Sequence, residues 1–204
     1  MRIVNCEQRT DAWWEARRGI PTASSFNKIV KADGSRATKA TRDLYLYKCA
    51  ASRLTGIREE SYTSPAMKVG VEREDFSRWV YAMEREVLVD EVGICISDCG
   101  RWGASPDGIV GDNGIIEIKN VIGSTLVAYN LGGKLPSGKI QQVQGQLFVA
   151  EREWCDFIAY SPKLPVFIVR VEPDHGFIAK LEKELIEFCE ELDEICERRL
   201  KIGG

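Results

Sequence analysis

The stretch RWGASPDGIVGDNGIIEIK, residues 101–119, carries the strongest structural signal in the sequence and predicts a β-hairpin. The apolar run after Ser-Pro-Asp-Gly leads into a Gly-Asp-Asn-Gly turn at 111–114, and Ile-Ile-Glu-Ile-Lys returns along it. Successive side chains of a strand point to opposite faces, so Glu117 and Lys119 share one face while the neighbouring isoleucines face a core. The fold back brings Asp107 alongside Glu117, within a residue or two of cross-strand register.

The hairpin therefore places two carboxylates and one ammonium group on a single face. Carboxylate oxygens are hard ligands that suit Mg²⁺ or Mn²⁺, and these ions keep other positions for water and phosphate. Lys119 can orient or deprotonate an attacking water, or neutralise charge that grows on a phosphate. The pattern predicts a metal-dependent nuclease site at Asp107, Glu117 and Lys119. Because Asp, Glu and Lys are common residues, the same spacing also arises by chance.

Ser-Pro-Asp-Gly at 105–108, followed by Glu-Ile-Lys at 117–119, is similar to the motif of the PD-(D/E)XK nucleases. More narrowly, it resembles the lambda-exonuclease (YqaJ-type) family of phage recombination exonucleases. The resemblance implies an α/β fold, with a mixed central β-sheet flanked by helices and a restriction-endonuclease-like core. It covers nearly the whole chain, because five motifs occur in the family's order.

A second motif near the N-terminus, Arg-Arg-Gly-Ile-Pro-Thr-Ala-Ser at 17–24, resembles the family's signature of an Arg followed by Gly and then Thr-Ala-Ser. Thr10 is expected to cap a short helix, and the Thr-Ala-Ser run is expected to open another. The resemblance implies that Arg17, Ser24 and Ser105 hold the 5′-phosphate of a DNA end. A guanidinium fork matches a phosphate, and a helix N-terminus offers free N–H groups. The alternative is that Arg17 is an ordinary surface residue and Ser24 only a cap.

A helix expected over residues 64–86, with Ser64 as its N-cap, supplies a third carboxylate by the same resemblance. The family places a Gly four residues before a Glu that faces the metal site, and this spacing selects Glu74. Glu72 and Asp75 are close rivals, and a solvated acidic helix face is the alternative.

A later helix, expected over residues 139–151, contains Gln-Gln-Val-Gln-Gly-Gln at 141–146. A Gln-x-Gln-x-Gln run on the helix after the catalytic strand is also a mark of this family. Its second glutamine, Gln144 here, resembles the residue that lines the active site. A glutamine at that place can hold a water or a phosphate oxygen without adding charge. The alternative is a polar, exposed helix face.

The composition fits a single α/β domain over residues 1–204, since roughly 70% of the surface of a chain of this length is buried on folding. No apolar run approaches the ~20 residues of a membrane span, and the N-terminus lacks the apolar core of a signal peptide, so a cytoplasmic location is expected. The seven cysteines form no C-x-x-C pair and there is one histidine. Reduced, mostly buried thiols are expected, and an iron–sulfur site is disfavoured.

The net charge of −3 is unevenly distributed along the chain. Residues 1–58 carry twelve Lys and Arg against five Asp and Glu, whereas residues 172–204 carry five basic and ten acidic residues. A basic N-terminal third allows a positive DNA-binding surface on a globally acidic protein. Solvated helix faces are the alternative.

The remaining periodicities predict the scaffold. A helix over 38–54 is expected to align Leu44, Tyr47, Ala51 and Leu54 on one apolar side. The other expected elements are a strand over 87–97, a loop over 120–136, strands over 154–161 and 165–172, and an amphipathic helix over 176–200.

The resemblance implies Mg²⁺-dependent 5′→3′ degradation of one strand of linear double-stranded DNA, which leaves a 3′ single-stranded tail. Asp107 and Glu117 would bind the metal with help from Glu74, Lys119 would position or activate water, and Gln144 would support the site. It further implies a phage or prophage origin, a ring-shaped homotrimer and a single-strand-annealing protein as partner. The alternatives are an endonuclease or junction resolvase with the same hairpin, and a DNA-end-binding protein without activity.

Overall fold

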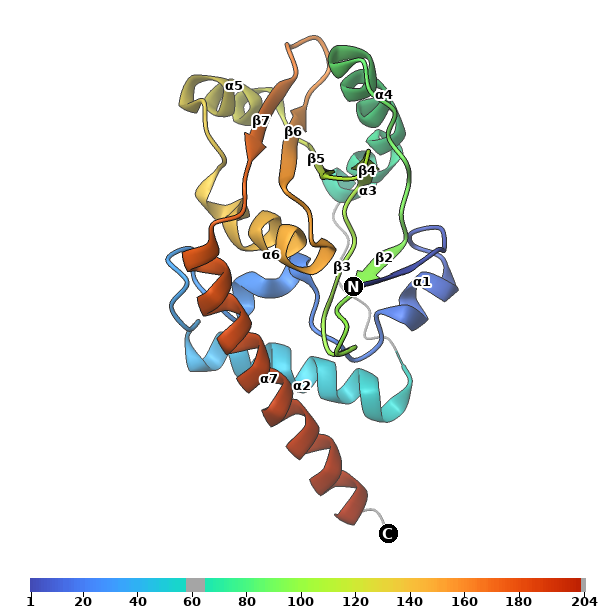
Figure 1. Ribbon diagram of the computed structural model, residues 1–204, viewed down its shortest axis with the longest axis vertical. Coiled ribbons are helices and arrows are strands. Elements are labelled where there is room, and N and C mark those ends of the chain that lie inside the picture. Colours follow the sequence, from blue (N-terminus) through green and yellow to red (C-terminus); the bar gives the residue numbers. More distant parts are fainter. Residues whose placement is uncertain (58–64, 203–204) are drawn as a thin grey trace.

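Two small β-sheets form the framework of the computed structural model, which describes residues 1–57 and 65–202 (Figure 1). The first is antiparallel and contains β1 (Arg2–Val4), β2 (Ile94–Ile96) and β3 (Gly103–Ala104). The second contains β4 (Gly108–Val110), β5 (Gly114–Asn120), β6 (Trp154–Tyr160) and β7 (Phe167–Val171) in that order. Only β5 and β6 pair in parallel within this second sheet, so it is mixed, as the sequence predicted.

Helices surround both sheets, and the chain has the predicted mixed α/β architecture (Figure 1). They are α1 (Asp11–Ala16), the 3-10 helix η1 (Ala23–Lys28), α2 (Lys39–Thr55), α3 (Pro65–Glu72), α4 (Glu74–Arg85), α5 (Gly123–Gly132), the 3-10 helix η2 (Ser137–Lys139), α6 (Ile140–Ala150) and α7 (His175–Ile202). The helix expected over 64–86 is interrupted at Arg73, and the proposed cap at Ser64 lies outside the described residues. The loop expected over 120–136 is wrong, because α5 forms there and buries Leu126.

The hairpin over residues 107–119 has the predicted geometry. Gly108 pairs with Ile116 and Val110 with Gly114, and the Asp107 N–H donates to the Ile116 carbonyl oxygen at 2.9 Å. Strand β5 is central, since it pairs with β4 on one side and β6 on the other. Its isoleucine face packs with Tyr81 of α4, while its opposite face lies beneath α6. The strand is therefore covered on both faces, which buries Glu117 to 1% exposure.

Helix α6 also anchors the N-terminal part of the chain. A Cβ at Gly145 would lie 2.4 Å from Phe26 Cδ2, a distance that no side chain tolerates. Glycine therefore lets η1 pack directly on α6, with Phe26 fully buried between them. This contact fixes the segment that follows Arg17 against the helix that covers the β5 face.

The apolar side of α2 was predicted wrongly. Leu44 and Tyr47 are 74% and 57% exposed, whereas Tyr45, Leu46 and Cys49 are buried. The buried side of the helix packs into the main core, and the same orientation turns Arg42 and Arg53 toward the acidic helix α7, which crosses α2 (Figure 1). Three arginines from the first part of the chain form ion pairs there: Arg36 with Glu184 at 2.7 Å, Arg42 with Glu191 at 2.5 Å, and Arg53 with Asp193 at 2.6 Å. Part of the charge asymmetry along the sequence is thus neutralised inside the fold.

The remaining elements follow the predictions with changed boundaries. Five of the six apolar positions expected on one side of α7, namely Phe177, Leu181, Leu185, Phe188 and Leu192, are buried, and the sixth, Ile195, is half-buried. The strand expected over 87–97 shrinks to β2, with Asp90 forming only an isolated bridge to Ile109. All seven cysteines are free and five of them are buried, as expected. None of the helices in the described part of the chain is long and apolar enough to cross a membrane.

Candidate active site

The hairpin brings together the three residues that the sequence selected. Asp107 precedes β4 and Glu117 lies on β5, and the register places them side by side. Asp107 Oδ2 accepts the Ile118 N–H at 2.6 Å, which ties the carboxylate to the backbone of β5. Lys119 follows Glu117 on the same face, and its ammonium group forms an ion pair with Glu117 Oε1. The structure thus assembles two acidic groups and one basic group within a single hairpin.

Two glutamines of α6 orient Glu117. Gln142 Nε2 donates to Glu117 Oε1 and Gln146 Nε2 donates to Glu117 Oε2, each at 2.6 Å. Both carboxylate oxygens are therefore held by amides, and the buried side chain has a fixed orientation. Residues four apart on a helix share a face, which explains why these two glutamines act together.

Gln144 does not line this site, which corrects the prediction from the glutamine run. Its Nε2 donates to the Glu172 carbonyl oxygen at 2.9 Å and its Oε1 accepts the Asp174 N–H at 2.7 Å. A helical residue two positions from Gln142 points to a different side of the helix. Gln144 thus holds the connection between β7 and α7, and its flanking glutamines contact Glu117 instead.

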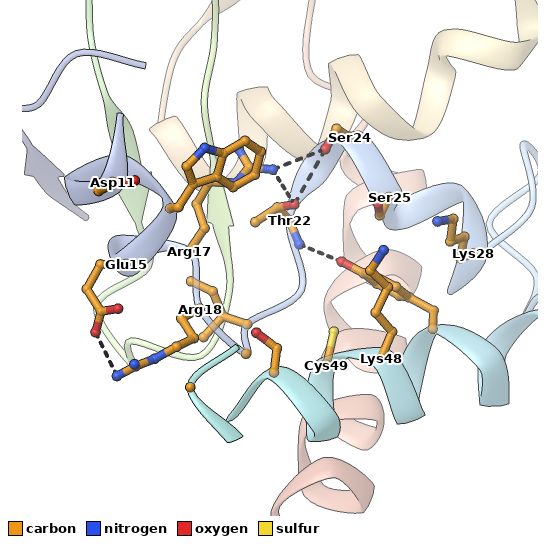
Figure 2. Close-up of a pocket in the computed structure, with 16 residues that line it drawn as sticks. Asp11, Glu15, Arg17, Arg18, Thr22, Ser24, Ser25, Lys28, Lys48 and Cys49 are labelled. Atoms are coloured by element: carbon orange, nitrogen blue, oxygen red, sulfur yellow. Dashed lines mark hydrogen bonds and ion pairs between the residues drawn. The ribbon is translucent and has the colours of Figure 1, made fainter. Parts of the chain in front are cut away.

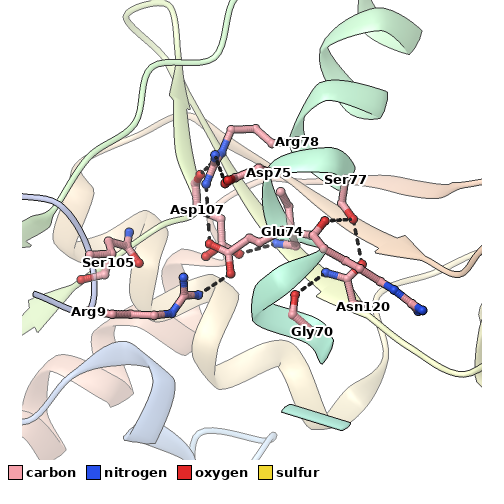
Figure 3. Close-up of polar contacts among 12 residues, drawn as sticks. Arg9, Gly70, Glu74, Asp75, Ser77, Arg78, Ser105, Asp107 and Asn120 are labelled. Carbon is pink, nitrogen blue, oxygen red and sulfur yellow. Dashed lines mark hydrogen bonds and ion pairs between the residues drawn. The ribbon is translucent and has the colours of Figure 1, made fainter. Parts of the chain in front are cut away.

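Glu74 lies on α4 beside Asp107, but two arginines engage its carboxylate (Figure 3). Arg9 forms an ion pair with Oε2, and Arg78 Nη2 lies 3.5 Å from Oε1. Among residues 1–57 and 65–202, no group of three or more His, Cys, Asp or Glu side chains is arranged to hold a metal ion. The predicted three-carboxylate set is therefore not assembled, although Glu74 adds negative charge near Asp107. Its rival Glu72 is exposed at the end of α3.

Arg78 was not predicted as a site residue, yet it connects α4 with the segment that carries Asp107. Its Nε donates to the Asp107 carbonyl oxygen at 3.0 Å, while Nη1 contacts Asp75 and Glu91 at 3.0 Å each. Nearby, Ser77 donates to Asn120 Oδ1 at 2.7 Å, and Asn120 Nδ2 donates to the Gly70 carbonyl oxygen (Figure 3). These contacts fix α3 and α4 against the hairpin formed by β4 and β5. A cleft of about 450 Å³ lined by Glu74, Arg78 and Asp107 opens beside them.

The electrostatics of the hairpin favour a cation. Burial raises the pKa of Asp107 well above its usual range, and the negative charge of Glu117 raises it further. Burial alone would lower the pKa of Lys119, but the charges of Glu117 and Asp107 outweigh it and the pKa is raised. The two carboxylates are buried and repel each other, so a bound cation would stabilise both. Their oxygens are hard donors, which fits Mg²⁺ or Mn²⁺.

A second polar cluster surrounds Arg17, the residue that ends α1 (Figure 2). Its Nη1 donates to Ser105 Oγ at 3.2 Å, and its Nη2 donates to Thr22 Oγ1 at 3.0 Å and to Ser24 Oγ at 3.5 Å. The structure therefore brings together Arg17, Ser24 and Ser105, as the sequence predicted, and adds Thr22. The helix expected at Thr-Ala-Ser is a six-residue 3-10 helix, so side chains rather than a helix dipole provide the positive character.

Trp13 fixes the orientation of this cluster. The Arg17 guanidinium carbon lies 4.0 Å from the centroid of the buried Trp13 ring, and Trp13 Nε1 donates to Ser105 Oγ at 3.0 Å. Ser105 Oγ thus accepts hydrogen bonds from both Trp13 and Arg17, which occupies both of its acceptor positions. Its own hydroxyl proton remains to be donated, and a phosphate oxygen is a suitable acceptor.

The cluster and the carboxylate pair are neighbours along the chain, since Ser105 stands two residues before Asp107. The intervening Pro106 carbonyl oxygen accepts Gln8 Nε2 at 2.9 Å, which holds this short connection in place. A polar cluster that contains one guanidinium group therefore adjoins a two-carboxylate site. This arrangement is suited to hold one phosphate while the next is cleaved.

Comparison with known families is consistent with this geometry. Residues 12–153 match the model of a protein family described as "YqaJ-like viral recombinase domain". This span includes Arg17, Asp107 and Glu117. The chain belongs to this family. The match confirms the resemblance that the hairpin and N-terminal motifs indicated.

Solved structures extend the YqaJ-like assignment to nearly the whole fold. The chain is 36% identical to an alkaline exonuclease, LHK-Exo, from Laribacter hongkongensis, with 95% of this chain and 98% of that chain covered and a TM-score of 0.85. A structure of LHK-Exo in complex with dAMP matches at 35% identity with the same coverage and TM-score. A phage-related exonuclease from Haemophilus somnus 129PT shares the fold at 16% identity, with 88% and 96% of the two chains covered and a TM-score of 0.68. None of the curated proteins compared with the chain matches it.

Proposed function

We propose that this YqaJ-type protein is a metal-dependent exonuclease that degrades one strand of linear double-stranded DNA from its 5′ end. The observation that carries the proposal is the adjacency of the Arg17 cluster and the Asp107–Glu117 pair through Ser105. Recognition of a terminal 5′-phosphate beside the acidic pair requires a DNA end, which an exonuclease needs and an endonuclease does not. The 36% identity to an alkaline exonuclease over 95% of the chain supports the same reaction class.

In this proposal, Asp107 and Glu117 would hold Mg²⁺, with Mn²⁺ as a substitute, and Glu74 would add negative charge to the site. When bound, the ion would stabilise negative charge on the scissile phosphate as a Lewis acid. Lys119 would position or activate the attacking water from the same face. Gln142 and Gln146 would keep Glu117 in one orientation, since they hold both of its oxygens.

The Arg17 cluster would bind the terminal 5′-phosphate. Arg17 presents a guanidinium fork, Ser105 presents its hydroxyl proton, and Ser24 lies at the edge of the same cleft. Hydrolysis that breaks the bond between phosphorus and the 3′ oxygen would release a 5′-mononucleotide. The shortened strand would then carry a new 5′-phosphate, so each turnover would recreate the group that Arg17 binds. Successive turnovers leave a 3′ single-stranded tail.

The assembly and biological setting are further proposals. The family suggests a ring-shaped homotrimer, and exposed apolar residues such as Leu44, Trp79 and Leu131 support self-association. We also propose a phage or prophage origin, action in the bacterial cytoplasm and a single-strand-annealing protein as partner. Sedimentation velocity of the purified protein tests the trimer directly, because a monomer near 22.9 kDa would contradict it.

The decisive assay compares linear with closed circular duplex DNA, each labelled and incubated with Mg²⁺. We expect digestion of the linear molecule only, with mononucleotides released from its 5′-phosphorylated ends. Cleavage of the closed circle would favour an endonuclease or junction resolvase. DNA binding without loss of the linear substrate would favour a DNA-end-binding protein that lacks activity.

A further inference from the structure

The cleft that contains Arg17 is larger than a terminal phosphate requires. It has a volume of about 580 Å³ and is lined by residues of α1, η1 and α2. Pockets of roughly 300–1,000 Å³ hold ligands much larger than one phosphate group. The cleft therefore has room beyond the cluster formed by Arg17, Thr22 and Ser24.

Two lysines line the part of the cleft that the terminal phosphate leaves free. Lys28 comes from η1 and Lys48 from α2, and Figure 2 shows both on the far side of Thr22 from Arg17. Tyr45 lies between the two groups, because its hydroxyl accepts the Thr22 N–H at 3.1 Å and its ring centroid is 5.1 Å from Lys28 Nζ. The positive charge of the cleft is thus divided into two groups with a tyrosine between them.

The two lysines lack the ion pairs that several basic residues around them form. On α2, Lys39, Arg42 and Arg53 each form an ion pair with an acidic side chain. Within the described ranges 1–57 and 65–202, neither Lys28 nor Lys48 forms one, and both are half-buried. The acidic Glu15, which lines the same cleft, is paired with Arg18 at 2.6 Å. Two ammonium groups in one cleft are therefore left to meet an external anion.

The 5′-to-3′ direction of a DNA strand bound in the cleft indicates which anion would meet the lysines. Ser105 marks the side of the Arg17 cluster that leads to Asp107, and the lysines lie on the other side of Thr22. If the phosphate held by Arg17 is followed by the scissile phosphate, any group at the lysines lies further toward the 5′ end. A fully paired, blunt end has no such group. An unpaired 5′ extension supplies one more nucleotide and its phosphate.

We propose that Lys28 and Lys48 form a second phosphate subsite that binds the first nucleotide of a single-stranded 5′ extension. This inference deepens the proposed function and rests on it for the direction of the strand. Lysines act as point charges that attract a phosphate without demanding one geometry, which suits a flexible unpaired nucleotide. The subsite would give the protein affinity for ends that are not blunt.

Equilibrium binding tests the subsite without requiring turnover. Two fluorescent duplexes, each with a single accessible end, are compared in Ca²⁺: one blunt with a 5′-phosphate, the other with a one-nucleotide 5′-phosphorylated extension. We expect the wild-type protein to bind the extended end about three- to tenfold more tightly, as two half-exposed ion pairs suggest. Lys28→Gln/Lys48→Gln should bind both ends equally.

A matched control removes the same charge elsewhere. Lys39→Gln/Lys183→Gln changes two exposed lysines outside the cleft, and it should retain the preference for the extended end. The affinity of each double variant for the blunt end measures its general loss of positive charge, so the ratio of the two affinities isolates the preference for the extended end. Equal binding of the two ends by the wild type, or loss of the preference in both double variants, would overturn the subsite. Failure of the wild type to digest blunt linear DNA in Mg²⁺ would instead contradict the proposed function, whatever the binding preference.

Discussion

The hairpin and the Arg17 cluster differ in how the chain builds them. Asp107, Glu117 and Lys119 come from one hairpin whose turn and strand pairing bring them together. Arg17 and Ser105, by contrast, are 88 positions apart and meet only because α1, η1 and the segment before β4 pack together. Local geometry therefore determines the acidic pair, whereas tertiary packing determines the phosphate cluster.

The difference extends to the burial of the two groups. Glu117 is enclosed on a central strand and held by two amides and an ammonium group. Ser24 is exposed at the edge of a cleft, and Arg17 reaches it at 3.5 Å. The hairpin should thus govern the chemical step on every substrate, while the cluster should govern which DNA ends are chosen.

The largest effect is expected at the acidic pair. Asp107→Asn or Glu117→Gln should lower Mg²⁺-dependent cleavage at least about a thousandfold, since loss of a metal ligand removes ~4 kcal/mol or more of transition-state stabilisation. The loss should be the same on 5′-phosphate and 5′-hydroxyl ends, measured as initial rates on labelled duplex. Amide variants are preferable to alanine because Glu117 is buried, and Ala would leave Gln142 and Gln146 without their acceptor.

Unchanged thermal unfolding and unchanged DNA binding in Ca²⁺ are the controls for these variants. A variant that keeps a tenth or more of the wild-type rate would remove its residue from the ligand set.

The next effect concerns the cluster. Arg17→Ala should slow digestion of 5′-phosphorylated ends about ten- to a hundredfold, because charge-assisted bonds to a phosphate contribute roughly 1.5–3 kcal/mol. On 5′-hydroxyl ends the change should matter much less, since there is no end phosphate to hold. Initial rates for two enzymes on two substrates give the answer. Equal losses on both ends would place Arg17 in general DNA binding or in the fold and would reject the pocket.

Gln146 and Gln144 form a matched pair on the same helix that sharpens the comparison. Gln146→Leu should lower cleavage about tenfold on both kinds of end, because it frees one oxygen of Glu117 from its amide partner. Gln144→Leu should leave the rate per folded molecule nearly unchanged but lower the free energy of unfolding by about 1–3 kcal/mol. The Glu172 carbonyl oxygen and the Asp174 N–H would lose their partner.

Rates normalised to the folded fraction, together with denaturant unfolding curves, separate the two effects. The opposite pattern, with Gln144→Leu inactive and Gln146→Leu active, would restore the original prediction for Gln144.

These residues also show what the sequence could predict and what it could not. The hairpin was predictable because strand alternation and a Gly-Asp-Asn-Gly turn fix the neighbours of Glu117 over a few residues. The glutamine run was recognisable, but which glutamine faces Glu117 depends on the rotation of α6, which its packing on η1 sets through Gly145. The i and i+4 spacing of Gln142 and Gln146 was the signal that could have identified the pair.

Helix α2 teaches the same lesson on a larger scale. Its sequence offers two apolar sides, and the buried one carries Tyr45 into the core together with Arg42, whose partner Glu191 on α7 is 149 positions away in the chain. Likewise, Arg9 carries no local motif, and its ion pair with Glu74, 65 positions away, arises only in the folded chain. Long-range ion pairs of this kind leave no periodicity in the sequence.

The smallest expected effect is at Thr22, the member of the cluster that only the structure assigned. Its Oγ1 accepts Arg17 Nη2 at 3.0 Å and lies 3.4 Å from Ser24 Oγ, so it holds one arm of the guanidinium fork toward the cleft. Valine has nearly the same shape but cannot accept this bond, and the Thr22 backbone N–H would still donate to Tyr45. Since a single net hydrogen bond contributes about 0.5–1.5 kcal/mol, Thr22→Val should slow digestion of 5′-phosphorylated ends about two- to tenfold. The exposed Thr41 on α2 provides the control, and Thr41→Val should leave the ratio of rates on phosphate and hydroxyl ends unchanged. If Thr22→Val slowed both kinds of end equally, the hydroxyl would act on the fold around Tyr45 and not on the orientation of Arg17.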